Sequence, residues 1–174
     1  MKFSRRGGVF FSSVFFATIQ LALADSFPLH GPIVPGGFAL LRHGIACAPA
    51  KAPLAVKRAI WAANQLRKWP YRFGGGHHSF IDTGYDCSGT VSYALAAAGL
   101  ICIPMSSRDL LHYGQRGRGK WITVYARNGH AFAVIAGLRL DTTAWGNRSD
   151  RYAPRWHSEI RPPRGFESRH PAGL

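Results

Sequence analysis

The chain has 174 residues, of which 47% are hydrophobic, so it is long and apolar enough to bury the core of one domain of ordinary size. These proportions exclude a globally disordered chain. The formal charge of +14 at pH 7 indicates an anionic environment, such as nucleic acid, membrane headgroups or an acidic wall polymer, without choosing among them.

The N-terminal residues 1–24 have the pattern of an export signal. Three basic residues lie within the first six positions, an apolar run over 9–23 follows, and Ala22-Leu23-Ala24 has the small-x-small form that precedes a cleavage site. A spanning helix needs roughly 20 apolar residues, so an uncleaved membrane anchor is the less favoured alternative. Cleavage would leave a formal charge of +11, because the segment holds three basic residues and no acidic one. We expect export to the periplasm, cell wall or medium, with no stable membrane span afterwards.

The next segment, 25–52, is rich in proline and glycine and predicts a linker or an arm lying over the domain. We expect the folded domain over 53–174. Apolar residues recur at helical spacing between Pro53 and Pro70, which predicts an amphipathic helix.

The stretch around Cys87 has the pattern of a helix start. Asp86 is a good N-cap residue, and apolar residues then recur on one helical face up to Gly99, which suits a C-terminal cap. Cys87 would lie in the first turn, where unpaired backbone N–H groups favour a thiolate. A buried, inert cysteine is the alternative, and this stretch alone leaves both open.

The second half of the chain changes to strand patterns. A loop and a short helix capped by Ser106 or Ser107 are expected over 101–111. Strands follow over 121–125, 130–136 and 138–141, and a last one is indicated near 165–168. Helices followed by an antiparallel meander predict an α+β fold.

Two patterns suggest ligand sites that their context does not support. Gly114 to Lys120 has the spacing of a phosphate-binding loop, but Trp121 stands where Ser or Thr should hold magnesium, and a strand follows it. His77 and His78 are adjacent, so their side chains diverge, and no further ligand stands at zinc spacing. We expect no nucleotide, metal or other cofactor.

His130 is the best candidate for a general base serving a thiolate at Cys87. It opens a strand directly after the Asn128-Gly129 turn, and Asp141 ends the next strand of a tight hairpin. Antiparallel pairing brings these two ends together, so Asp141 can orient the imidazole as the third member of a triad. Asp141 could instead cap the turn that follows it. The chain has no G-x-S-x-G elbow, which disfavours a serine hydrolase.

The chain has three cysteines: Cys47, Cys87 and Cys102. An odd number in an exported protein leaves at least one thiol free, or pairs it between chains. A Cys47–Cys102 bridge would leave Cys87 free, and three free thiols are the alternative.

Three segments together resemble the signature of the NlpC/P60 cysteine peptidases, which are papain-like cell-wall hydrolases. They are Pro70-Tyr71-Arg72-Phe73-Gly74-Gly75, Asp86-Cys87-Ser88-Gly89-Thr90-Val91 and Gly129-His130. The resemblance covers about residues 53–145. It implies an α+β papain-like core, with N-terminal helices packed on an antiparallel sheet, and cleavage of amide bonds in peptidoglycan stem peptides.

The resemblance also implies roles for single residues. Cys87 matches the nucleophile, His130 the base and Asp141 the third polar residue. Tyr71 matches a position that lines the oxyanion region, and Asp86 and Ser88 match positions that can bind the free amino end of the stem peptide. The chain departs from the family at the third position, commonly His, in the turn before the histidine strand and in its Arg-rich tail.

The sequence therefore predicts an exported, monomeric cysteine peptidase or amidase acting on peptidoglycan, held near anionic envelope polymers by charge and without specific nucleic-acid binding. Two alternatives stay open. One is an acyl or amide transferase that uses the same Cys-His dyad. The other is a non-catalytic basic protein that binds envelope polymers.

Overall fold

The computed structural model describes residues 26–143, 154–158 and 162–174. The predicted export signal lies outside this part of the chain. The elements of the first half are β1 (Ile33–Val34), β2 (Leu40–Arg42), β3 (Ile45–Pro49), α2 (Leu54–Leu66) and α3 (Cys87–Ala97). The second half contains α4 (Ser107–Leu110), β4 (Gln115–Arg116), β5 (Ile122–Arg127), β6 (His130–Ile135), β7 (Leu138–Asp141), β8 (Arg155–His157) and β9 (Glu167–His170).

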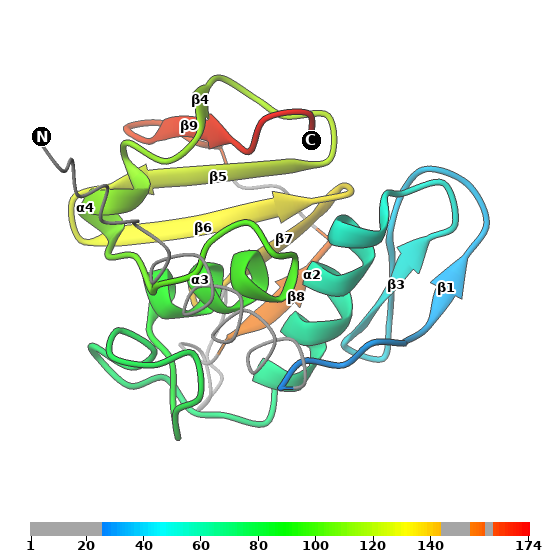
Figure 1. Ribbon diagram of the computed structural model, residues 1–174, viewed down its shortest axis with the longest axis horizontal. Coiled ribbons are helices and arrows are strands. Elements are labelled where there is room, and N and C mark those ends of the chain that lie inside the picture. Colours follow the sequence, from blue (N-terminus) through cyan, green and yellow to red (C-terminus); the bar gives the residue numbers. More distant parts are fainter. Residues whose placement is uncertain (1–25, 144–153, 159–161) are drawn as a thin grey trace, which may run out of the picture.

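The main sheet has six strands in the order β4-β9-β5-β6-β7-β8, and every neighbouring pair is antiparallel. Helices α2 and α3 pack together and lie against the sheet, so the main core is a single helix–sheet interface (Figure 1). Inward-facing residues of β6, such as Ala131, Ala133 and Ile135, are buried there. This arrangement confirms the α+β fold.

The β5–β6 hairpin sets the position of His130. Arg127 pairs with His130, which leaves Asn128 and Gly129 as a two-residue turn, and Gly129 has a φ of 79°. Turns of this kind need positive φ, which glycine adopts without strain. A second tight turn at Ala136-Gly137 returns the chain as β7.

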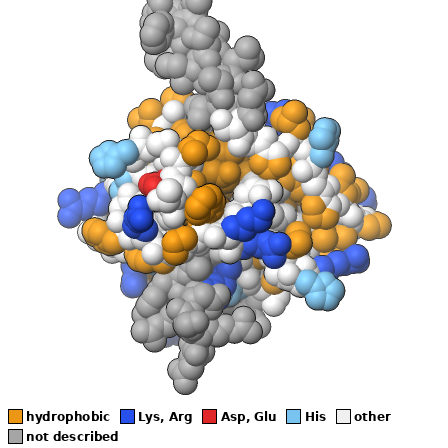
Figure 2. Space-filling view, turned by 90° about the horizontal axis from the view of Figure 1, so that it is seen from below, with side chains coloured by type: hydrophobic (Ala, Val, Ile, Leu, Met, Phe, Trp, Pro, Cys, Tyr) orange, Lys and Arg blue, Asp and Glu red, His pale blue; other side chains and the backbone are white. Residues whose placement is uncertain are grey.

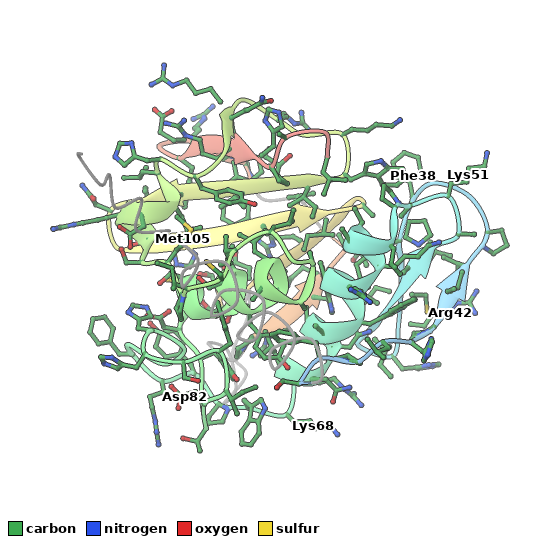
Figure 3. The ribbon with its side chains drawn as sticks, in the orientation of Figure 1. Phe38, Arg42, Lys51, Lys68, Asp82 and Met105 are labelled. Atoms are coloured by element: carbon green, nitrogen blue, oxygen red, sulfur yellow. The ribbon has the colours of Figure 1, made fainter. Side chains whose placement is uncertain are left out.

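Helix α3 begins and ends as its sequence predicts. The side chain of Asp86 accepts a 2.8 Å hydrogen bond from the Gly89 N–H, and Gly99 at φ 73° closes the C-terminus. The helix is buried on nearly all sides rather than on one face, because β6 and β7 pack on one side and α2 on another. Its buried polar groups are satisfied: the Ser92 hydroxyl bonds both backbone groups of Met105, labelled in Figure 3.

The predicted short helix is present as α4, and Ser106 caps it in a reciprocal capping box with Asp109. The glycine-rich basic segment 114–120 begins as β4, paired with β9 at the sheet edge, and β5 follows it. That setting is a sheet edge and not the strand–loop–helix context of a phosphate-binding loop.

Segment 25–52 was expected to be a linker or an arm, and its described residues 26–52 contain three short strands. Strands β1, β3 and β2 form a small sheet beside α2 (Figure 1), and Ala46 and Ala48 of β3 are fully buried. Asn64 of α2 holds this sheet by exchanging two 2.9 Å hydrogen bonds with the backbone of Ala46. The sequence offered little strand signal here, because the strands are short and proline-flanked.

The surface of the described residues is strongly basic. Figure 2 shows Lys and Arg side chains spread over one face with little acidic surface between them. Arg42, Lys51 and Lys68 extend outward on the side of the small sheet and α2 (Figure 3). Between residues 26 and 174, the described helices include none long and apolar enough to cross a membrane.

The loop before α3 and the start of α3 touch backbone to backbone. A side chain at Gly89 would overlap the carbonyl oxygen of Gly75, and one at Gly75 would overlap the carbonyl oxygen of Gly84. The Gly75 carbonyl also accepts a 3.2 Å hydrogen bond from the Asp86 N–H. The loop is therefore clamped to the helix turn that carries Cys87.

We expect Gly89→Ala to lower the free energy of unfolding by about 1–3 kcal/mol, because the new methyl group forces the two backbones apart. In the interior of a solvent-exposed helix, Gly→Ala would raise the free energy of unfolding by roughly 0.5–1 kcal/mol. The sign of the measured change therefore tests the backbone contact. Urea unfolding measures the difference. Gly37→Ala is the matched control, since no atom lies within 4 Å of its added methyl group. Unchanged or increased stability of Gly89→Ala would contradict the clamp.

Candidate active site

Cys87 is the first residue of α3 and is 7% exposed at the edge of a hollow of about 270 Å³. The hollow is also lined by Tyr71, Phe73, His77, Asp86, Ser88 and Gly129 and by the start of α4. The sulfur therefore lies at a helix N-terminus beside a space that a substrate can enter.

His130 and Asp141 meet across the β6–β7 hairpin, as their spacing predicts. His130 Nε2 lies 3.1 Å from Asp141 Oδ1 and 3.2 Å from Thr143 Oγ1. The Cys87 side chain also acts on the His130 ring, and raises its pKa through hydrogen bonding and negative charge. Because Nε2 faces the carboxylate, Nδ1 is the nitrogen left for the sulfur.

These contacts favour a charged imidazole. Burial opposes the charge most strongly, but hydrogen bonds and negative charges from Asp141 and Cys87 outweigh it and raise the pKa of His130 from 6.5 to about 9. For Asp141, burial acts to raise the pKa, yet hydrogen bonds from His130 and from the Thr143 backbone, with nearby positive charge, hold it below its ordinary value. The pair is therefore ionised at neutral pH.

Arg139 supplies part of that positive charge from behind the carboxylate. It lies two residues before Asp141 on β7, so both side chains are on the same face of the sheet. Its Nη1 lies 3.5 Å from Asp141 Oδ2, and both side chains are completely buried. Four groups thus follow one another in the site: the Cys87 sulfur, the His130 imidazole, the Asp141 carboxylate and the Arg139 guanidinium. In this order, groups that can carry negative charge alternate with groups that can carry positive charge.

Asp86 lies beside Cys87 at the centre of a second network. Its Oδ1 accepts hydrogen bonds from the Gly89 N–H at 2.8 Å and from the Ser88 hydroxyl at 3.0 Å. Its Oδ2 accepts one from the Gly74 N–H at 3.2 Å and lies 2.8 Å from His77 Nε2. Asp86 and Ser88 are buried, so this network forms part of the floor next to the thiol.

Tyr71 lies on the rim of the hollow and is bridged to Tyr85 in a short parallel contact. Burial, and then the negative charges of Cys87 and Asp86, raise the pKa of Tyr71 above its ordinary value. Its hydroxyl therefore stays protonated at neutral pH and can donate a hydrogen bond into the hollow.

The six predicted site residues are thus gathered in one region, while other candidates are not. All three cysteines are free, with Cys47 buried and Cys102 exposed, so no Cys47–Cys102 bridge forms. His78 is exposed next to the half-buried His77. Among the described residues, no group of three or more His, Cys, Asp or Glu side chains is arranged to hold a metal ion.

Sequence reasoning missed three contributors: His77, Arg139 and Thr143. His77 was weighed only as a metal ligand, although its place in a glycine loop before the Asp86-Cys87 segment hinted at the hollow. Arg139 carried one signal, since a charged residue at i−2 on the same strand shares a face with Asp141. Thr143 lies in the turn after Asp141, and its N–H donates a 3.0 Å hydrogen bond to Asp141 Oδ1, so the expected alternative of a cap occurs together with the contact to His130.

Comparison with known proteins identifies the fold. No protein-family model matches the chain, and no curated protein sequence is significantly similar to it. Among solved structures, the chain is similar to the peptidoglycan hydrolase RipB from Mycobacterium tuberculosis, with 20% identity and a TM-score of 0.54 over 93% of this chain and 86% of that chain. The chain has the fold of this hydrolase.

The chain is also similar to Rv1477, a hypothetical invasion protein of Mycobacterium tuberculosis, with 19% identity and a TM-score of 0.51. That likeness covers 88% of this chain and 82% of the other. The papain-like α+β core expected from the NlpC/P60 resemblance is confirmed. Within this NlpC/P60 fold, α3 supplies the cysteine and the sheet supplies the histidine.

We expect the imidazole of His130 to titrate near pH 9 in the folded protein, and its midpoint to fall in Asp141→Asn, because the variant loses the adjacent negative charge. Its contribution to the free energy of unfolding is complete below about pH 6.5 and is lost as the pH rises through about 9. NMR titration of the ring protons measures the midpoint. Asp82→Asn, in an exposed loop, is the control that leaves it unchanged. A wild-type midpoint near 6.5 would contradict the contact.

We expect Arg139→Met to lower the free energy of unfolding by about 3–5 kcal/mol, because it removes one of the cations beside a buried carboxylate. The double variant Arg139→Met/Asp141→Asn should lose less than the two single losses added together. Chemical denaturation measures each value. Arg42→Met removes an exposed arginine and should change stability by less than about 0.5 kcal/mol. If Arg139→Met also lowers stability by less than about 0.5 kcal/mol, the buried Arg139–Asp141 pair contributes little to the free energy of unfolding.

Proposed function

We propose that the chain is an exported cysteine peptidase or amidase that hydrolyses amide bonds in the stem peptides of peptidoglycan. The observation that carries the proposal is the meeting of Cys87, His130 and Asp141, which come from three different elements, at a point where Cys87 lines the hollow. The similarity of the fold to a peptidoglycan hydrolase supports the choice of polymer.

In the proposed reaction the Cys87 thiolate attacks the carbonyl carbon of the amide, and the electron pair moves to the carbonyl oxygen. When the tetrahedral intermediate collapses, the C–N bond breaks and the His130 imidazolium gives its proton to the leaving amine. The acyl group remains on sulfur as a thioester. His130 then takes a proton from a water molecule that attacks the thioester carbon, and the C–S bond breaks, which releases the acid and restores the thiolate and imidazolium pair.

Asp141 acts in this scheme as the residue that orients His130 and stabilises its charge. Tyr71 is proposed to line the oxyanion region, where its protonated hydroxyl can donate together with backbone N–H groups at the start of α3. Asp86 and Ser88 are proposed to form the substrate-binding floor on the other side of the sulfur.

The charge of the chain is proposed to hold it close to its substrate. Residues 1–24 would direct export, and the remaining chain, with a formal charge of +11, would be attracted to anionic envelope polymers as a monomer. Salt screens such attraction, so retention on envelope material should weaken as ionic strength rises.

We expect purified protein to release stem-peptide fragments from sacculi and Cys87→Ala to reduce the rate by a factor of at least roughly 1,000, because the nucleophile is lost. Mass spectrometry of the soluble products measures release. Products ending in a free acid indicate hydrolysis, whereas an acyl group joined to an acceptor amine would favour a transferase. Cys102→Ala removes an exposed free thiol and is the matched control. Full activity of Cys87→Ala would overturn the mechanism.

A further inference from the structure

Phe166, in the C-terminal part of the chain, contacts the ring of His130. The two ring centroids are 6.0 Å apart and the ring planes meet at 73°, which is an edge-to-face arrangement. Phe166 makes a second contact of this kind with Phe132, at 5.1 Å and 75°. His130 thus has an aromatic neighbour besides its polar partners.

A turn and a strand pairing place Phe166 in this position. Its N–H donates a 3.0 Å hydrogen bond to the Pro163 carbonyl, and Gly165 between them has a φ of 75°. A β-turn with positive φ at its third residue favours glycine there, because glycine adopts that conformation without strain. Strand β9 begins at the next residue and pairs with β5. Phe166 is therefore held beside the end of β5, at Arg127.

The guanidinium of Arg127 lies over the ring of Phe166, with its Cζ 4.7 Å from the ring centroid. A cation in this place is attracted by the electrons of the aromatic face. Arg127 is also the residue that pairs with His130 across the β5–β6 turn. Like charges that face each other across a strand pair are destabilising, and Phe166 gives the guanidinium an aromatic partner instead.

Two further aromatic rings support Phe166. Phe132 is completely buried, and its ring stacks on that of Tyr125 with the centroids 4.8 Å apart. These two residues pair across β5 and β6, on the same face of the hairpin as Arg127 and His130. The Phe166 ring is therefore held by Phe132 and Arg127, so it can restrict the motion of the His130 ring.

Resting on the proposed function, we infer that Phe166 is a positioning residue for His130: its ring keeps the imidazole turned with Nε2 toward Asp141 and Nδ1 toward Cys87. The terminal torsion of a histidine side chain is broad, so the imidazole can turn away from both partners. A phenyl ring packed against it limits that rotation without competing for either nitrogen. The described residues that line the hollow do not include Phe166, so it acts through His130 and not on the substrate.

Phe166→Leu in the full chain tests this inference, with a soluble synthetic stem peptide as substrate. We expect kcat to fall by roughly 3- to 10-fold, the range that one aromatic contact supports. KM should stay within about 2-fold, because the substituted side chain does not line the hollow. Phe166→Tyr keeps the ring and should retain most of the wild-type kcat. Phe27→Leu is the matched control, since it removes an edge-to-face contact with Tyr93, at 5.0 Å and 79°, and should leave kcat unchanged.

A second measurement does not depend on the identity of the substrate. We expect iodoacetamide to alkylate Cys87 more slowly in Phe166→Leu than in the wild type, by a similar factor, because a displaced imidazolium stabilises the thiolate less. The exposed thiol of Cys102 in the same sample is the internal control, and its alkylation rate should not change. Mass spectrometry of the two cysteine peptides measures both rates.

An unchanged kcat or an unchanged rate of Cys87 alkylation in Phe166→Leu overturns the inference. Equal losses in Phe27→Leu also overturn it, because they would indicate a general effect of stability. If Phe166→Leu fails to fold, Phe166→Met takes its place with the same expected losses. If the wild type cleaves neither sacculi nor peptide while Cys87 alkylation still depends on Phe166, the proposed function is overturned and the positioning of His130 is supported.

Discussion

The hydrogen bonds to the Asp86 carboxylate tie together the parts of the molecule that surround the candidate nucleophile. Asp86 Oδ1 caps the N-terminus of helix α3 and accepts a hydrogen bond from the Ser88 hydroxyl. Asp86 Oδ2 accepts a hydrogen bond from the glycine loop and contacts His77. A buried carboxylate that accepts several hydrogen bonds stabilises each donor more than a neutral acceptor would. Because Cys87 is the next residue, its direction relative to the hollow depends on this one side chain.

The second buried carboxylate of the site, that of Asp141, lies between two cationic side chains. Asp141 faces a buried arginine on one side and a histidine on the other, in a sheet interior where an isolated charge would be expensive. The resemblance indicated that histidine is common at this position, and a neutral side chain there would need no cation behind it. Arg139 is consistent with the change to Asp, since an anion in this place requires a balancing charge.

The sequence was a good guide wherever local signals and pairing rules agree. The cap at Asp86, the turn at Asn128-Gly129 and the hairpin that joins His130 to Asp141 follow from residue types and spacing alone. It was a poor guide to the small sheet of segment 25–52, whose strands are held by long-range contacts such as the Asn64 amide. His77 was missed for the same reason, since only folding brings its ring onto the residues around Cys87.

The backbone contact between the glycine loop and α3 differs in kind from the lining of the hollow beside the thiol. Where Gly75 and Gly89 touch, a side chain at either position would overlap backbone atoms, so this contact requires glycine. The lining of the hollow includes side chains such as Phe73, His77 and Arg108, which can be replaced without moving the main chain. Changes in the choice of substrate among descendants of this protein would therefore arise at such lining positions, while Gly75 and Gly89 would stay glycine.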